Sequence, residues 1–451
     1  MKQDFTQGNP GKVILMFALP MLIGNIFQQL YSTVDTMVVG NFVGKNAIAA
    51  VGGTFSIQFL ILSIAIGFTS GMSIVISQLY GAKDAEKLKK AYSTGVIFVI
   101  ILSIVLSVVG IILTRPALIY MLQTPEEIYA DSYKYLFITF IGFPALFIYN
   151  MYASVLRAIG DSKTPLYFLI LSTVVNIVLD LVFVIQLHMG VSGVAIATLI
   201  AQCISAVACH IYVGKRFEIL KLTKDTLCFD KEMLMGIIKY GVPSAVQQSV
   251  LALNFMIVQR FVNFYGSDMI AAYSVVNKIE NFVTMPIMNL ALALSMFAGQ
   301  NIGAGEEERA KRGVYDTMKI QAIFCAFVFL VLPLISNTLL KMFGMGDDQA
   351  VIKIGIEAIS LCSKFYVIFA LFQVINNFLR GVGDAQFSMF TTICMILIRL
   401  PITYVLVYMV QYGEISIWIG MIMGWATISL VGLFRFFTGG WKGKAFAQAR
   451  K

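Results

Sequence analysis

Long apolar stretches separated by short polar segments run through the whole chain. A helix that crosses the hydrocarbon core of a membrane needs about 20 residues, most of them apolar. This pattern predicts an all-α polytopic membrane protein with twelve transmembrane helices. The predicted spans are 13–39, 47–76, 91–114, 133–156, 165–187, 190–213, 233–260, 269–297, 313–336, 354–379, 386–410 and 415–437.

The second half of the chain repeats the first at a nearly fixed distance. "QLYGAKDAEKLKKA" (78–91) recurs 222 residues later as "QNIGAGEEERAKRG" (300–313), and "LRAIGD" (156–161) recurs 223 residues later as "LRGVGD" (379–384). Six spans per half give both halves the same orientation, which places their symmetry axis along the membrane normal. We therefore predict two pseudo-symmetric six-helix lobes around a central cavity. The predicted limits are an N-lobe over 1–213, a cytoplasmic linker over 214–232 and a C-lobe over 233–451.

Charge indicates which side of the membrane holds the ends of the chain. Twelve spans place both termini on one side, and most Lys and Arg residues lie in loops on that side. Because cytoplasmic loops carry an excess of Lys and Arg, we expect both termini in the cytoplasm and a location in the plasma (inner) membrane. The opposite side carries six basic residues: Lys45, Arg115, Lys134, Arg260, Lys341 and Lys353.

Composition narrows the classes of partner. Apolar residues make up 59% of the chain and charged residues only 13%, about half the charged share of a soluble domain. The net charge of +9 is spread between apolar runs, which favours a basic membrane face over a nucleic-acid site. We expect the lipid bilayer and small organic substrates as partners, no nucleic acid, and a functional monomer. The two histidines and six cysteines show no metal-ligand spacing, so neither a cofactor nor a metal is expected.

A carboxylate interrupts the first span. "FQQLYSTVDTMVVG" (27–40) contains Asp35, and a charge near the bilayer centre costs about 2.5–3.5 kcal/mol. Counted from the outer ends of their spans at about 1.5 Å per residue, Asp35, Asp180 and Thr198 lie at a similar depth, roughly 8–12 Å below the outer surface. Asn176 lies four residues before Asp180 and therefore on the same helix face.

No Lys or Arg of the N-lobe lies at this depth to neutralise the carboxylates. Two neighbouring carboxylates without a basic partner must share a proton or hold a cation. Asp35, Asn176, Asp180 and Thr198 are therefore the predicted cation-coupling site, with H⁺ or Na⁺ as the coupling ion. The alternative is that each Asp only hydrogen-bonds a neighbouring helix.

Several motifs in a fixed order resemble one transporter family. They are the 34-residue stretch that begins "LPMLIGNIFQQLYSTVD", the segment "NIVLD" (176–180) and the paired "LRAIGD" and "LRGVGD". Together with the two-lobe plan they resemble the multidrug and toxic compound extrusion (MATE) family, nearest its DinF-like branch. The resemblance covers nearly the whole chain. It implies a cation-coupled exporter whose lobes rock about a central cavity.

The resemblance also implies site residues. The positions of Asp35, Asn176, Asp180 and Thr198 match the N-lobe cation site of this branch. Another branch of the family carries coupling acids in spans 7 and 10, where this chain has Val250 or Leu251 and Ala370. We therefore do not expect those C-lobe acids to couple transport here.

The C-lobe carries its own charges at membrane depth: Lys278, Glu280, Lys364 and Arg399. Glu280 could pair with one or two of the bases and fix helix packing. Alternatively, an unpaired base could contact an anionic part of a substrate or a lipid headgroup. The sequence leaves the role of the three bases open.

Substrate contacts and a hinge complete the expected site. Met side chains adapt to varied shapes and aromatic rings attract cations, although such residues often only pack in the core or face lipid. Pro20 lies on the same helix as Asp35 and is the candidate hinge, because proline can bend a helix; an ordinary membrane-helix proline is the alternative. The predicted substrate-cavity residues are Gln28, Tyr31, Gln247, Asn277, Glu280, Phe282, Met285, Met288 and Arg399.

These features favour a secondary active transporter over an enzyme. The expected function is a cation-coupled (H⁺ or Na⁺) antiporter that exports organic, cationic or amphipathic compounds by alternating access. The alternative is a lipid-linked precursor flippase of the same superfamily. "GVGD" (381–384) fits the pattern of an intramembrane aspartyl protease, but it recurs as "AIGD" (158–161) without a partner aspartate in a neighbouring span. A turn between paired helices explains both copies better.

Overall fold

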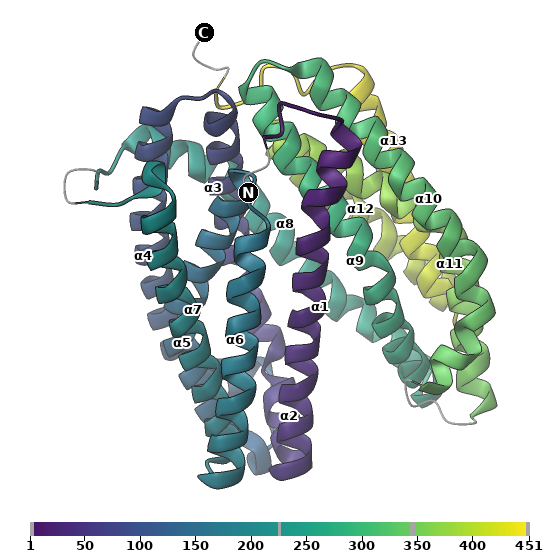
Figure 1. Cartoon of the computed structure of the whole chain (residues 1–451). Coiled ribbons are helices and arrows are strands. Elements are labelled where there is room, and N and C mark those ends of the chain that lie inside the picture. Colours follow the sequence, from purple (N-terminus) through teal and green to yellow (C-terminus); the bar gives the residue numbers. More distant parts are fainter. Residues whose placement is uncertain (1–3, 224–226, 343–347, 448–451) are drawn as a thin grey trace. The chain divides into compact units, whose positions relative to one another are not determined.

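The computed structural model describes residues 4–223, 227–342 and 348–447, and every regular element within these ranges is helical (Figure 1). Twelve helical segments are long and apolar enough to cross a membrane, so the prediction of an all-α protein with twelve transmembrane spans is confirmed. The helices are α1 (Pro10–Phe42), α2 (Lys45–Gly53), α3 (Phe55–Gly81), α4 (Ala85–Pro116), α5 (Glu126–Ala158), α6 (Lys163–Leu181), α7 (Gly190–Arg216), α8 (Lys231–Phe264), α9 (Ser267–Gly303), α10 (Glu307–Leu340), α11 (Gln349–Gly381), α12 (Ala385–Tyr404) and α13 (Ser416–Phe437). Single π-helical turns extend α4, α6 and α12, namely η1 (Ala117–Met121), η2 (Val182–Gln186) and η5 (Val405–Met409), and the 3₁₀ turn η3 (Glu218–Leu220) follows α7.

The second span differs from its prediction, because it is two helices rather than one. α2 ends at Gly53 and α3 begins at Phe55. Thr54 holds the break: its hydroxyl donates to the carbonyl oxygen of Val51 at 2.8 Å and accepts from Gln58 Nε2 at 3.0 Å. In the second half, α9 continues unbroken past the equivalent position. Gly52 and Gly53 weaken the helix before the break, but the hydrogen bonds of Thr54 decide where the helix ends.

Contacts divide the chain into two compact units. Unit 1 contains Leu19–Ser249, and unit 2 contains Asp4–Ala18 and the residues from Val250 onward. The first turns of α1 therefore belong to unit 2 and the rest of α1 to unit 1, while α8 begins in unit 1 and ends in unit 2. α1 changes unit at Leu19, next to Pro20, whereas α8 changes unit at Val250, two helical turns after Pro243. The predicted lobe and linker limits remain a prediction.

Unit 1 is a bundle in which α5 packs against α3, α4 and α7, and α6 packs against α7. Glycines let α3 approach the first half of α8. A Cβ atom added to Gly71 would lie 2.4 Å from the backbone nitrogen of Gly241, and one on Gly67 would lie 2.2 Å from Ala245 Cα. Small residues at membrane-helix crossings allow this kind of close backbone packing.

The start of α8 is tied to α4 by side chains. Ser93 Oγ donates to the carbonyl oxygen of Cys228 at 2.8 Å and accepts from its backbone N–H. The backbone N–H of Asp230 donates to Thr94 Oγ1 at 3.0 Å. The helix that ends in unit 2 therefore starts from a fixed position in unit 1.

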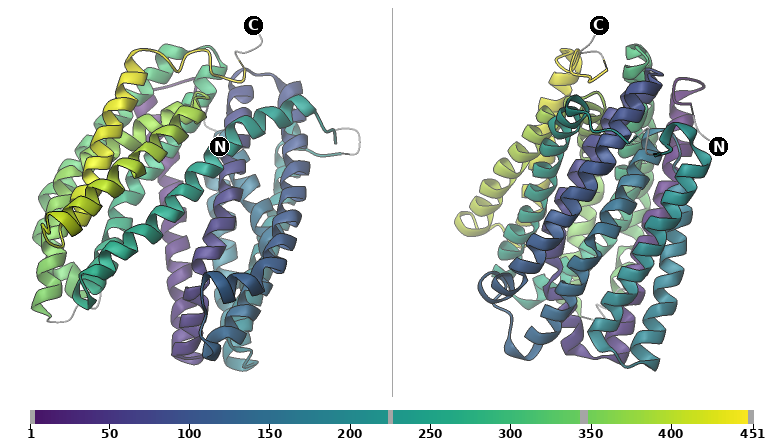
Figure 2. Two further views of the ribbon diagram at one scale, coloured as in Figure 1. Left: turned by 180° about the vertical axis from the view of Figure 1, so that it is seen from behind. Right: turned by 90° about the vertical axis from the view of Figure 1, so that its left-hand side faces the viewer.

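Unit 2 is built around α11, which packs against α9, α10, α12 and α13 (Figure 2). Its core is aromatic, with the ring centroids of Phe369 and Trp425 4.7 Å apart. The N-terminal segment is docked on the same unit. Arg309 donates to the carbonyl oxygens of Phe5, Gln7 and Gly8 at 3.0, 2.6 and 2.8 Å, and Phe5 is fully buried.

Helix ends in the two halves are capped differently. The carboxylate of Asp84 accepts from the backbone N–H of Lys87 at 3.0 Å and caps α4. This backbone hydrogen bond holds the pKa of Asp84 below its usual value. The corresponding residue before α10, Glu306, makes no side-chain cap.

Candidate cation and substrate site

Two acidic side chains from different helices of unit 1 lie near each other. Asp35 lies on α1 and Asp180 near the end of α6, and their carboxyl groups interact electrostatically with each other. Asp180 is 0% exposed. Both its carboxylate oxygens, and Oδ1 of Asp35, are buried without a hydrogen-bond donor among the described residues. No salt bridge to either carboxylate occurs within the described ranges. Since ionised carboxylates only accept hydrogen bonds, this pair needs a proton or a cation.

The two other predicted site residues lie beside this pair. Thr198 of α7 receives a hydrogen bond from Asn176 Nδ2 at 3.4 Å, and its hydroxyl lies 3.0 Å from Tyr31 Oη. Asn176 is fully buried, and its Oδ1 atom has no donor among the described residues. The structure therefore brings together all four residues predicted for cation coupling. Carboxylate, amide and hydroxyl oxygens are the ligands that hard cations prefer.

A cavity of about 210 Å³ lies next to this oxygen cluster, within unit 1. Asp35, Tyr31 and Thr198 line it, so the carboxylate is reachable from the cavity. Rings of Phe55, Phe59 and Phe143 form part of its wall, and aromatic faces attract organic cations. Ligand pockets for drug-sized molecules measure about 300–1,000 Å³. This cavity therefore has room for a cation or for part of a larger organic molecule.

Sequence reasoning missed Tyr135 of α5, which also lines the cavity and interacts electrostatically with both Asp35 and Asp180. A signal for it exists in the sequence. Tyr135, Thr139 and Gly142 follow one another at steps of four and three residues and all line the cavity, so they form a stripe along one helix face. A search for polar residues at helical spacing along span 4 would have found it.

In unit 2, the predicted ion pair between Glu280 and a neighbouring base is not formed within the described residues. Tyr366 Oη donates to Glu280 Oε1 at 3.2 Å. Arg399 is only 8% exposed and interacts electrostatically with Tyr273, while its Nε atom has no acceptor among the described residues. Glu280 and Arg399 interact at longer range. A tyrosine hydroxyl, rather than a direct ion pair, is therefore the hydrogen-bond partner of Glu280.

The predicted cavity residues on α9 differ in exposure. Asn277, Glu280 and Met285 are half-buried, whereas Phe282 and Met288 are exposed on unit 2. Lys278 lies on the exposed side and was not among the predicted lining residues. Arg399 is buried in unit 2, and its role as a substrate contact stays a prediction.

The remaining predictions fall on both units. Gln28 is exposed on unit 1, and Tyr31 lines the cavity described above. Gln247 is 9% exposed on α8. Lys364 is exposed near the middle of α11, and no acidic oxygen of the described residues lies within 4.0 Å of Lys278 or Lys364.

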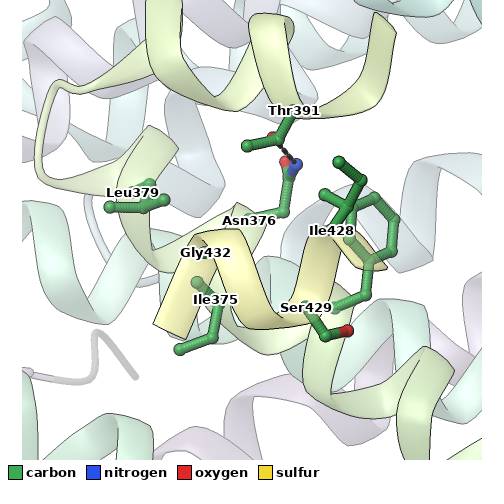
Figure 3. Close-up of a pocket in the computed structure, with 8 residues that line it drawn as sticks. Ile375, Asn376, Leu379, Thr391, Ile428, Ser429 and Gly432 are labelled. Carbon is green, nitrogen blue, oxygen red and sulfur yellow. Dashed lines mark hydrogen bonds between the residues drawn. The ribbon is translucent and has the colours of Figure 1, made fainter. Parts of the chain in front are cut away.

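A second hollow, in unit 2, is too small to hold a substrate. It measures about 10 Å³, room for about one water. Figure 3 shows Asn376 in its wall, with Nδ2 donating to Thr391 Oγ1 at 3.1 Å. Ser388 donates in turn to Asn376 Oδ1. This polar contact joins α11 to α12 and is structural.

Comparison with known proteins connects this geometry to a family. A model of the MatE family matches residues 20–182 and again residues 243–405, two segments offset by 223 residues. The chain is 33% identical over 441 residues to "Probable multidrug resistance protein YoeA" of Bacillus subtilis, covering 96% of this chain and 94% of that protein. It is 30% identical over 444 residues to "Probable multidrug resistance protein YpnP" of the same organism, covering 97% of both.

A solved structure shares the fold. A MOP superfamily transporter from Pyrococcus furiosus, whose binding pocket is described as having reverse polarity, superimposes with a TM-score of 0.90 at 23% sequence identity, covering 97% of this chain and 98% of that one. The twelve apolar helices make this chain a multi-pass membrane protein, and its relatives make it a transporter rather than an enzyme. The chain belongs to the MatE family of multidrug and toxic compound extrusion transporters.

Proposed function

We propose that the chain is a secondary active antiporter that exports organic, cationic or amphipathic compounds in exchange for H⁺ or Na⁺. The observation that carries this proposal is the Asp35–Asp180 pair, which is buried, unpaired with any base among the described residues, and open to a cavity through Asp35. Relatives named as multidrug resistance proteins support the export of several compounds.

Electrostatics explains why the pair exchanges cations. Two unit charges about 4 Å apart repel each other by roughly 4 kcal/mol at an effective dielectric constant of about 20. Since every 1.4 kcal/mol is about tenfold in an equilibrium, the doubly ionised pair without a cation is a rare state. The pair therefore binds a proton or Na⁺ whenever no other cation is present.

The cavity allows substrate and coupling ion to compete. An organic cation that enters the unit 1 cavity meets aromatic rings and the carboxylate of Asp35. Its positive charge takes the place of the coupling ion beside the two carboxylates. Binding one cation then favours release of the other, which is the requirement for antiport. Asn176 and Thr198 add an amide and a hydroxyl oxygen to the cation site. The proposed substrate contacts are Gln28, Tyr31, Gln247, Asn277, Glu280, Phe282, Met285, Met288 and Arg399.

The proposal includes alternating access by two lobes, with Pro20 as a hinge. Pro20 follows Leu19, the first residue of α1 assigned to unit 1. A bend there would change the tilt of the helix segment that carries Asp35. Location in the plasma membrane, cytoplasmic termini and function as a monomer belong to the same proposal, and the distribution of Lys and Arg supports the orientation.

The test is efflux of a fluorescent cationic dye from proteoliposomes under separately imposed pH and sodium gradients. We expect one of the two gradients to drive efflux, and we expect Asp180→Asn to abolish that response. An efflux rate that is independent of both gradients would contradict cation coupling. A gradient-dependent efflux rate in Asp180→Asn would show that the coupling site does not include Asp180.

A second candidate is a lipid-linked precursor flippase. It is favoured by Lys278 and Lys364, which are exposed at membrane depth without an acidic partner within 4.0 Å among the described residues and could contact a phosphate. Charged side chains in spans rarely face lipid directly. Scrambling of a fluorescent lipid pyrophosphate in the same vesicles, lost in the Lys278→Gln/Lys364→Gln double variant, would favour this function. No scrambling above protein-free vesicles would exclude it.

A further inference from the structure

A groove on the surface of unit 1 lies apart from the candidate cation site. It is lined by Phe168 of α6 and by Ala208, Ile211, Tyr212, Lys215 and Arg216 of α7, and its volume is about 500 Å³. The rings of Phe168 and Tyr212 meet edge to face, with centroids 5.6 Å apart. The groove therefore has an apolar floor and a basic end.

The basic end lies where α7 leaves the membrane. Lys215 and Arg216 are the last two residues of the helix and are both exposed. No acidic oxygen of the described residues lies within 4.0 Å of either side chain, and no acidic residue lines the groove. The groove therefore carries a positive charge that no acidic side chain of the described residues neutralises, at the depth of the lipid headgroups.

An apolar strip continues from the groove toward the middle of the membrane. Ile211, Val207 and Ile204 follow at steps of four and three residues on α7 and are 49%, 58% and 40% exposed. On the neighbouring α6, Leu171 and Val174 are also exposed. This strip follows the direction of an acyl chain whose headgroup lies at Lys215 and Arg216. Tyr212, at the boundary, has the amphipathic character typical of membrane interfaces.

We propose that this groove binds one anionic phospholipid of the leaflet on the side of the chain termini. The phosphate contacts Lys215 and Arg216, and one acyl chain follows Ile211, Val207 and Ile204. Both helices are membrane spans, so lipid is the molecule that surrounds the groove. Basic pockets between transmembrane helices on this side are suited to anionic headgroups. The basic end selects an anionic headgroup over a zwitterionic one.

Native mass spectrometry of the detergent-solubilised protein tests this site. The protein is titrated with phosphatidylglycerol or with phosphatidylcholine of the same acyl chains. One basic residue near an anionic headgroup is worth roughly fivefold in affinity. We therefore expect Lys215→Gln/Arg216→Gln to bind phosphatidylglycerol about 30-fold more weakly, with little change for phosphatidylcholine. The matched control is Lys83→Gln/Lys89→Gln, which removes two exposed charges on the same membrane side but outside the groove, and it should bind as the unaltered protein does.

A steric variant locates the lipid independently of charge. Ala208→Phe fills the groove and leaves both basic residues in place, and we expect it to lose the bound phosphatidylglycerol. Full binding by Ala208→Phe would show that the lipid lies elsewhere. Equal losses in the two double variants, or equal affinity of the unaltered protein for both lipids, would show only nonspecific attraction to the protein surface. Either result would overturn the proposal.

Discussion

Replacing Asp180 by Asn is the most informative single change to the candidate site. Asn has nearly the same shape as Asp and keeps one acceptor oxygen, but it cannot carry the negative charge. Asp180 is fully buried, and its carboxyl group interacts electrostatically with that of Asp35. One carboxylate about 4 Å from a bound monovalent cation contributes roughly 4 kcal/mol at an effective dielectric constant of about 20. Its loss should weaken cation binding about 1,000-fold.

Dye efflux from proteoliposomes measures this loss. We expect Asp180→Asn to insert and fold normally, and to export dye no faster under an imposed pH or sodium gradient than liposomes without protein. The matched control is Asp268→Asn, which removes an exposed carboxylate in the first turn of α9 and should retain gradient-driven efflux. The reasoning fails if Asp180→Asn keeps both the rate and the gradient dependence, because the second carboxylate would then be unnecessary.

Three further variants test the fold and the hinge. Gly71→Ala places a Cβ atom 2.4 Å from the backbone of Gly241 and should destabilise the protein by about 1–3 kcal/mol, seen as a lower Tm in detergent. The control Gly214→Ala adds a Cβ atom with no other atom within 4 Å, so it should leave the Tm unchanged. Equal Tm values for the two variants would contradict the close crossing of α3 and α8. Asp84→Ala removes the cap of α4 and should cost about 1 kcal/mol at pH 7. Because the folded-state pKa of Asp84 is lowered, this contribution is present above the unfolded-state pKa and lost as pH falls through the folded-state pKa, so the Tm difference from the unaltered protein should shrink in acid; a constant difference would argue against the charged cap. Pro20→Ala should change the efflux rate without changing the amount of inserted protein, and unaltered efflux would count against the hinge.

The twelve spans could be predicted from the sequence because hydrophobic length is a direct physical requirement of the membrane. The break at Thr54 could not, since Gly52 and Gly53 lie inside a continuous apolar run and membrane helices tolerate glycine. What ends the helix there is the pair of hydrogen bonds made by Thr54. Such a contact depends on local geometry and not on the hydrophobic pattern.

The proximity of the four residues predicted for cation coupling also followed from the sequence. Asp35, Asn176, Asp180 and Thr198 meet because depth along straight helices can be counted at about 1.5 Å per residue. Depth alone does not give the direction of a side chain within a bundle. That limit explains why Tyr135 was missed in unit 1 and why the sequence left the partners of the charges in unit 2 open. Glu280 and Arg399 share a depth, yet Glu280 accepts its hydrogen bond from Tyr366 of α11.

The central claim is that an organic cation displaces the coupling ion from the Asp35–Asp180 pair. The most direct measurement adds a cationic dye to the purified protein in weakly buffered, sodium-free detergent and follows proton release, then repeats the titration with increasing Na⁺. We expect dye binding either to release protons, with Asp180→Asn releasing none, or to weaken in proportion to added Na⁺. Dye binding that releases no protons and is indifferent to Na⁺ would contradict the account.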